Sequence, residues 1–178
     1  NKSGVFDKSI TDVLKSVMPI VIILGHLSYR VGLGWIQPFR SWGAPFVSVF
    51  FFISGYGLFS AYMKKGVAYL DGFFKKRILR VLLPLFVTIS LYYIVIHIPQ
   101  KEYLLNLLEQ VKTGTSSQSH LWYVYALVLL YFIFYLAFKF VPEKWRIGTL
   151  TCFTVVVLCV LRAIGYDRCW YVGLLAFP

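Results

Sequence analysis

Long apolar runs alternate with short polar and basic segments along this chain. Each complete run is close to the roughly 20 apolar residues that a helix needs to cross a bilayer. The five complete runs cover about 13–30, 46–63, 78–98, 121–140 and 147–165, and a sixth at 170–178 is cut off by the end of the sequence. The pattern predicts an all-α fold, a polytopic membrane helical bundle with five to six transmembrane helices in one embedded domain over 1–178. Because the sixth run is incomplete, we expect the chain to be truncated at its C-terminus.

The composition agrees with a membrane protein. Hydrophobic residues make up 59% of the chain and charged residues 14%, whereas about a quarter of the residues in a soluble domain are charged. The net charge of +11 would suit nucleic acid, but the cations lie between the apolar runs, where membrane orientation requires them. We therefore expect no nucleic acid partner and expect membrane lipid around the helices.

The distribution of Lys and Arg predicts which side of the membrane each end occupies. If the runs alternate across the membrane from a cytoplasmic N-terminus, twelve of the 18 Lys and Arg residues lie on the cytoplasmic side. Cytoplasmic loops carry an excess of these residues. We therefore predict a multi-pass protein whose N-terminus is cytoplasmic and whose His26 lies in the outer half of the first span.

Two polar residues share one face of the first apolar run. Lys15 and His26 are eleven residues apart, which on a helix separates them by about 20° and about 16 Å along the axis. Because a bare charge or imidazole in hydrocarbon costs several kcal/mol, this stripe should face protein or water. Histidine exchanges protons near neutral pH, so His26 is a candidate catalytic residue. The alternatives are an interfacial histidine and a lysine that only anchors the helix.

A basic segment opens the third run. On a helix, Arg80 lies beside both Lys76 and Arg77, so the three cations form one patch at the inner membrane surface. Such a patch suits a polyanionic phosphate ligand, because Arg offers bidentate contacts. The alternative is positive-inside anchoring or binding of anionic lipid head groups.

Small and aromatic residues mark two further segments. Ser54 and Gly55 interrupt a bulky Phe-rich run, which indicates either close helix packing or an opening that admits a substrate. Trp122 opens the fourth run at its outer end, where an aromatic belt explains it, and the neighbouring His120 is a candidate to line the same outer cavity as His26. No spacing of His, Cys, Asp or Glu suggests a metal site, so none is expected.

Taken in order, these segments resemble the motifs of the membrane-bound acyltransferase-3 family, bacterial integral-membrane proteins that O-acylate sugars of the cell envelope. Lys15 and Lys76 depart from the pattern, because the family usually has Arg at both places, and lysine lacks the bidentate fork. The family also has more spans than the five or six seen here. The matching segments are Lys15 to His26, Phe52 to Gly57, Lys76 to Arg80 followed by Pro84, and His120 to Tyr123.

The resemblance implies transfer of an acyl group, most often acetyl, from cytoplasmic acyl-CoA to a hydroxyl of an extracytoplasmic glycan, in the bacterial inner membrane. His26 would act as general base or carry the acyl group, and Lys15, the second residue assigned to catalysis, would continue the positive path from the inner surface into the bilayer. Two rival classes remain open, a carrier or flippase for an anionic or glycan-linked solute and a structural membrane subunit. The implied acyl-CoA-binding residues are Lys76, Arg77 and Arg80, and the implied acceptor-side residues are Ser54, Gly55, His120 and Trp122.

Overall fold

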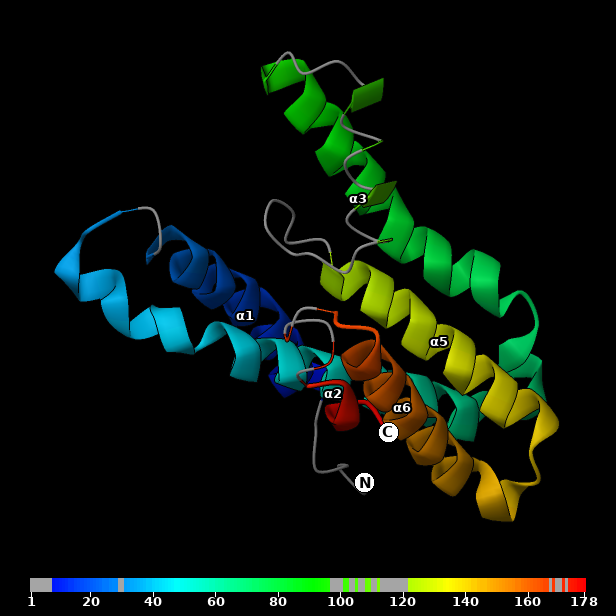
Figure 1. Cartoon of the computed structure of the whole chain (residues 1–178). Helices are drawn as coiled ribbons and strands as arrows, with labels where there is room; N and C mark the ends of the chain where they lie inside the picture. The colour runs from blue at the N-terminus through cyan, green and yellow to red at the C-terminus, as the bar shows by residue number, and fades with distance from the viewer. Residues whose placement is uncertain are drawn as a thin grey trace. The chain divides into compact units, whose positions relative to one another are not determined.

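The computed structural model describes residues 8–28, 31–96, 101–102, 105, 108–109, 112, 122–166, 168, 171 and 173–178. These residues form helices joined by turns, with no strand among them, which confirms the all-α prediction. The α-helices are α1 (Lys8–Ser28), α2 (Gly43–Lys65), α3 (Phe73–Ile96), α5 (Trp122–Phe140) and α6 (Arg146–Ala163) (Figure 1). Short 3-10 helices are η1 (Gly34–Ser41), η2 (Gly66–Leu70), η3 (Glu143–Trp145) and η5 (Leu174–Ala176).

Among the described residues, four helical segments are long and apolar enough to cross a membrane. They are Ser9–Ser28, Gly43–Leu70, Trp122–Phe140 and Glu143–Ala163. The predicted span at 78–98 falls largely on α3, which is not one of the four, and its last two residues lie outside the described residues. The described residues of the predicted sixth span form a turn and η5 instead of an α-helix. The number of spans and the cytoplasmic N-terminus therefore stay predictions.

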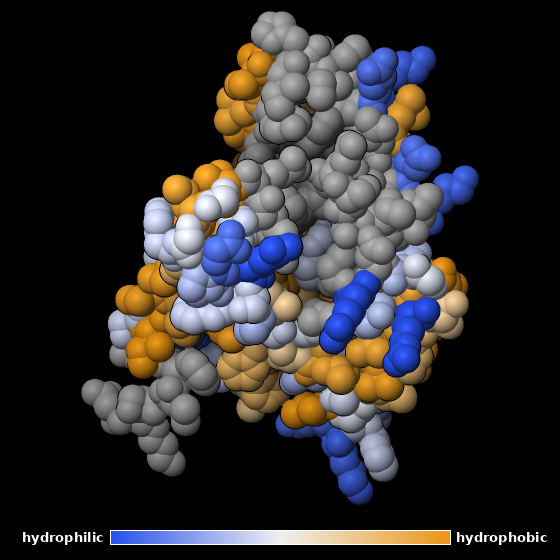
Figure 2. Space-filling view, turned by 60° about the vertical axis from the view of Figure 1, so that its left-hand side comes forward, coloured by the Kyte–Doolittle hydropathy of each residue, from blue (hydrophilic) through white to orange (hydrophobic). Residues whose placement is uncertain are grey.

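Many of the large apolar side chains of these helices point outward. Ile23 is 63% exposed, Phe86 65% and Val95 73%. The space-filling view accordingly shows broad orange surface between blue hydrophilic side chains (Figure 2). Soluble proteins rarely expose contiguous apolar patches beyond a few hundred Å², so this surface fits helices surrounded by lipid.

By its contacts the chain divides into two compact units. The first comprises Asn1–Leu58 with Val172–Pro178, and the second comprises Phe59–Tyr171. Helix α2 passes from one unit into the other, because the boundary falls within it. A single domain over 1–178 stays a prediction.

In the first unit, α1 packs against η1. The buried residues of α1 recur at intervals of three and four, as a helical face requires: Met18, Val21, Gly25 and Ser28. Gly25 lets η1 approach α1 closely, because a Cβ at this position would lie 2.9 Å from the carbonyl oxygen of Phe39 in η1. Helix η1 thus lies against the last turns of α1.

In the second unit, α5 is the central helix and contacts η2, α3 and α6. Nine of its 19 residues are buried, among them Leu130 and Phe134 at 0% and 1% exposure. Helix α3 contacts α5 through its first turn and diverges from it toward its C-terminus (Figure 1). The short connections 66–72 and 141–145 bring the end of α2, the start of α3, the end of α5 and the start of α6 to one end of this unit.

Candidate functional site

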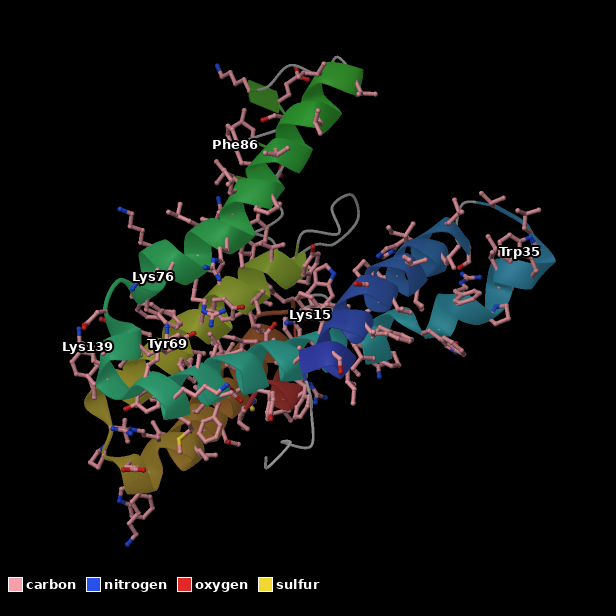
Figure 3. The ribbon with its side chains drawn as sticks, turned by 180° about the vertical axis from the view of Figure 1, so that it is seen from behind. Lys15, Trp35, Tyr69, Lys76, Phe86 and Lys139 are labelled. Atoms are coloured by element: carbon pink, nitrogen blue, oxygen red, sulfur yellow. The ribbon has the colours of Figure 1, made fainter. Side chains whose placement is uncertain are left out.

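Lys15 and His26 lie on one continuous helix, as predicted. Helix α1 runs without interruption from Lys8 to Ser28, although it contains Pro19. Lys15 is exposed and His26 is half-buried, and both flank the buried face of the helix (Figure 3 labels Lys15). Since the helix is unbroken, the expected rise of about 16 Å between the two residues holds.

The backbone around His26 is fixed from two sides. The hydroxyl of Ser28 donates a hydrogen bond to the carbonyl oxygen of Gly25 at 2.6 Å, and η1 lies against Gly25. His26 belongs to the last turn of α1, where the helix dipole favours a positive charge.

Gly55 is a site of close backbone packing in the first unit. A Cβ at Gly55 would overlap the carbonyl oxygen of Phe177 and would lie 3.0 Å from its carbonyl carbon and 3.4 Å from its Cα. Gly55 and Phe177 are both buried, whereas Ser54 is half-buried. Of the two interpretations of this segment, the structure favours close packing at Gly55. A role of Ser54 and Gly55 on the acceptor side stays a prediction.

The predicted basic patch lies in the first two turns of α3. The Nε of Arg77 donates a hydrogen bond to the hydroxyl of Tyr69 at 2.6 Å, and its Cζ lies 5.4 Å from the centre of the Tyr69 ring. The Nζ of Lys76 donates to the carbonyl oxygen of Asp71 at 3.1 Å. Arg80 is exposed. The structure therefore brings the three predicted phosphate-binding cations onto one short helical segment.

Aromatic packing holds this segment on α5. Phe73, the first residue of α3, is 1% exposed, and its ring stacks on Phe134 with centroids 6.0 Å apart. The rings of Phe74 and Tyr135 pack together with their centroids 4.6 Å apart. Aromatic pairs of this kind contribute about 0.5–1.5 kcal/mol each beyond their buried area. The basic patch thus follows directly on an aromatic cluster that packs the start of α3 against α5.

Two further cations lie at the same end of the second unit. Lys139 donates to the hydroxyl of Tyr135 at 2.7 Å, and Figure 3 shows it at the end of the unit where Tyr69 and Lys76 lie. Arg146 donates to the carbonyl oxygen of Val141 at 3.0 Å and lies over the ring of Tyr62 at 5.2 Å. The apolar pattern of the sequence predicts no function for any of these aromatic partners. The spacing of four residues between Tyr135 and Lys139, which puts both side chains on one helix face, is the local sign of their contact.

The other predicted site residues that the structure describes are divided between the two units. Trp122 is the half-buried first residue of α5 and contacts Tyr123 edge to face at 6.5 Å. His120 lies outside the described residues. Lys15, His26, Ser54 and Gly55 belong to the first unit, and Lys76, Arg77, Arg80 and Trp122 to the second. Among the described residues, no group of three or more His, Cys, Asp and Glu side chains could hold a metal ion.

Comparison with known proteins identifies the family. The acyltransferase-3 family model, described as an acyltransferase domain, matches residues 10–177. This match covers nearly the whole chain, so the chain belongs to this family. No curated protein and no solved structure matches it. Together with the apolar helices, membership makes the protein a multi-pass membrane acyltransferase.

Proposed function

We propose that the protein moves an acyl group, acetyl in the simplest case, from cytoplasmic acyl-CoA to a hydroxyl of a glycan outside the bacterial inner membrane. The basic patch of Lys76, Arg77 and Arg80 is the observation that carries this proposal. Coenzyme A bears a diphosphate and a further phosphate, and clustered cations with bidentate Arg groups recognise such anions. Because these cations share two turns of a helix that aromatic packing holds in place, little ordering is needed when the donor binds.

His26 supplies the acid–base chemistry in this proposal. The imidazole takes the proton from the acceptor hydroxyl while the hydroxyl oxygen attacks the thioester carbonyl. A carbon–oxygen bond forms, the carbon–sulfur bond breaks, and the departing thiolate takes up a proton to give free CoA. In the second version of the mechanism, the imidazole first accepts the acyl group from CoA and then passes it to the hydroxyl. In both versions Lys15 extends the positive charge from the inner membrane surface toward His26.

The acceptor belongs near His26 in this proposal, because the imidazole must reach its hydroxyl. We place the glycan hydroxyl in the outer half of the first span, and the acceptor-side roles of Ser54, Gly55, His120 and Trp122 are those that the family resemblance implies. An aromatic ring such as that of Trp122 offers an apolar face with a polar edge, which suits a carbohydrate at the membrane–water boundary. The proposal requires the cytoplasmic donor and the external acceptor to reach the same imidazole.

Release of free CoA thiol in membrane vesicles tests this function. The wild-type protein is supplied with acetyl-CoA and an envelope-glycan extract, and Arg80→Ala is compared with Lys144→Ala, a change of an exposed lysine in η3 outside the patch. We expect Arg80→Ala to raise the apparent KM for acetyl-CoA about tenfold, because a contact between charged groups is lost. Lys144→Ala should leave KM unchanged. Binding of CoA without any thiol release would instead support the carrier.

A further inference from the structure

We propose that Tyr69 is a positioning residue for the acyl-CoA site, which it serves by holding the guanidinium of Arg77 in the orientation that binds phosphate. This inference rests on the proposed function, because it assumes that the basic patch receives the phosphates of CoA. Tyr69 lies outside the family segments named above, and nothing in the sequence pattern singles it out. The evidence is the contact between the two side chains and the way the fold fixes it.

The contact between Tyr69 and Arg77 has two components. The phenol oxygen accepts a hydrogen bond from Nε at 2.6 Å, and the guanidinium carbon lies 5.4 Å from the ring centre, within the range of a cation–π interaction. Because the hydrogen bond uses Nε, the two terminal nitrogen atoms of Arg77 remain available for a bidentate contact with a phosphate. A long, rotamer-rich side chain is thereby oriented before the ligand arrives.

The turn between α2 and α3 brings Tyr69 to Arg77. Gly66 and Gly72 have φ values of +60° and +66°, a conformation that favours glycine, and they bracket η2 at each end. Tyr69 therefore folds back over a residue eight positions later in the chain. Its ring also packs edge to face against Phe73, with centroids 5.8 Å apart, so the phenol is itself held in place.

Neither of the other two cations of the patch has a comparable side-chain support. Lys76 donates to the main-chain carbonyl of Asp71, and Arg80 is exposed. Arg80 interacts with Tyr69 only through its charge. Arg77 is half-buried and is the cation of the patch that an aromatic side chain orients. Removing the hydroxyl of Tyr69 should therefore weaken CoA binding through Arg77 alone.

A double-mutant cycle on CoA binding tests the inference. The dissociation constant for unacylated CoA is measured on the purified protein for wild type, Tyr69→Phe, Arg77→Met and the double variant. Tyr69→Phe keeps the ring but loses the acceptor oxygen, and methionine keeps an unbranched apolar side chain but has no donor to offer the phenol. We expect Tyr69→Phe to weaken binding about 3–10-fold in the wild-type background and to have no further effect beside Arg77→Met.

Tyr135→Phe is the matched control, because Tyr135 also accepts a hydrogen bond from a cation, Lys139, at the same end of the unit. It should leave CoA binding unchanged. Equal losses for Tyr69→Phe and Tyr135→Phe, or an equal loss for Tyr69→Phe with and without Arg77, would overturn the inference.

Thiol release, measured in parallel, separates this inference from the proposed function. If the wild type binds CoA but releases no thiol with any acceptor, the reaction is wrong while the dissociation constants still decide the role of Tyr69. Failure of the wild type to bind CoA would overturn both. In the active protein, Tyr69→Phe should raise KM for acetyl-CoA and leave kcat unchanged, whereas a general folding defect would lower kcat as well.

Discussion

Replacing Gly55 by alanine tests the close backbone contact in α2. The added methyl would overlap the carbonyl oxygen of Phe177 and would lie 3.0 Å from the adjoining carbonyl carbon. These are main-chain atoms, so they cannot move aside as the end of a flexible side chain would. Forcing a methyl into a packed site costs about 1–3 kcal/mol, while alanine gains up to about 1 kcal/mol over glycine in a helix interior. We expect Gly55→Ala to be destabilising by about 1–2 kcal/mol in total.

Gly57 provides the matched control, because it lies two residues further along the same helix and a Cβ there would meet no atom within 4 Å. Both variants gain the same helix propensity, so the difference between their melting temperatures isolates the overlap with Phe177. Measured by thermal unfolding in detergent, Gly55→Ala should melt about 2–12 °C below Gly57→Ala, because the overlap costs about 1–3 kcal/mol and each kcal/mol lowers the melting temperature by about 2–4 °C in a chain of this size. Equal melting temperatures would refute the close contact with Phe177.

Two further predictions use matched pairs in the same way. Gly25→Ala should lower the melting temperature and the activity relative to Gly34→Ala. Of these two glycines, Gly25 is the one, next to His26, whose added methyl would lie 2.9 Å from the Phe39 carbonyl oxygen. Equal stability and activity of the two variants would contradict this contact. Phe73→Ala should lower the free energy of unfolding by about 3–5 kcal/mol, as for other buried aromatic residues, and should weaken CoA binding. Phe86→Ala, at a side chain that is 65% exposed, should do neither. Unchanged CoA binding in a folded Phe73→Ala protein would show that the basic patch does not depend on this aromatic contact.

The helices themselves were largely predictable, because apolar runs of about 20 residues have few other structures available. The ends of the helices were not. Helix α1 begins at Lys8 and α3 at Phe73, each five residues before the apolar run, because backbone hydrogen bonding continues into polar sequence. The sequence of the 3-10 helix η1 has no apolar run that predicts a helix there. Its position depends on Gly25 and the Phe39 carbonyl, a contact between residues 14 apart.

The candidate site was predictable only where its residues share one helix. Helical spacing correctly placed Lys76, Arg77 and Arg80 on one short segment. It gave no sign of Tyr69, because that contact depends on a turn with two glycines in the left-handed conformation. The approach of residue 177 to Gly55 joins positions that are far apart in the chain, and local sequence carries no information about such a pairing.

Transfer of radiolabelled acetyl from acetyl-CoA to glycan, compared between the wild type and His26→Ala, tests the central claim most directly. Loss of a general base or acyl carrier should lower kcat by about 10²–10⁴-fold. The dissociation constant for CoA should stay unchanged, because the proposed phosphate contacts lie on α3. A His26→Ala protein that transfers acetyl at the wild-type rate would contradict the account.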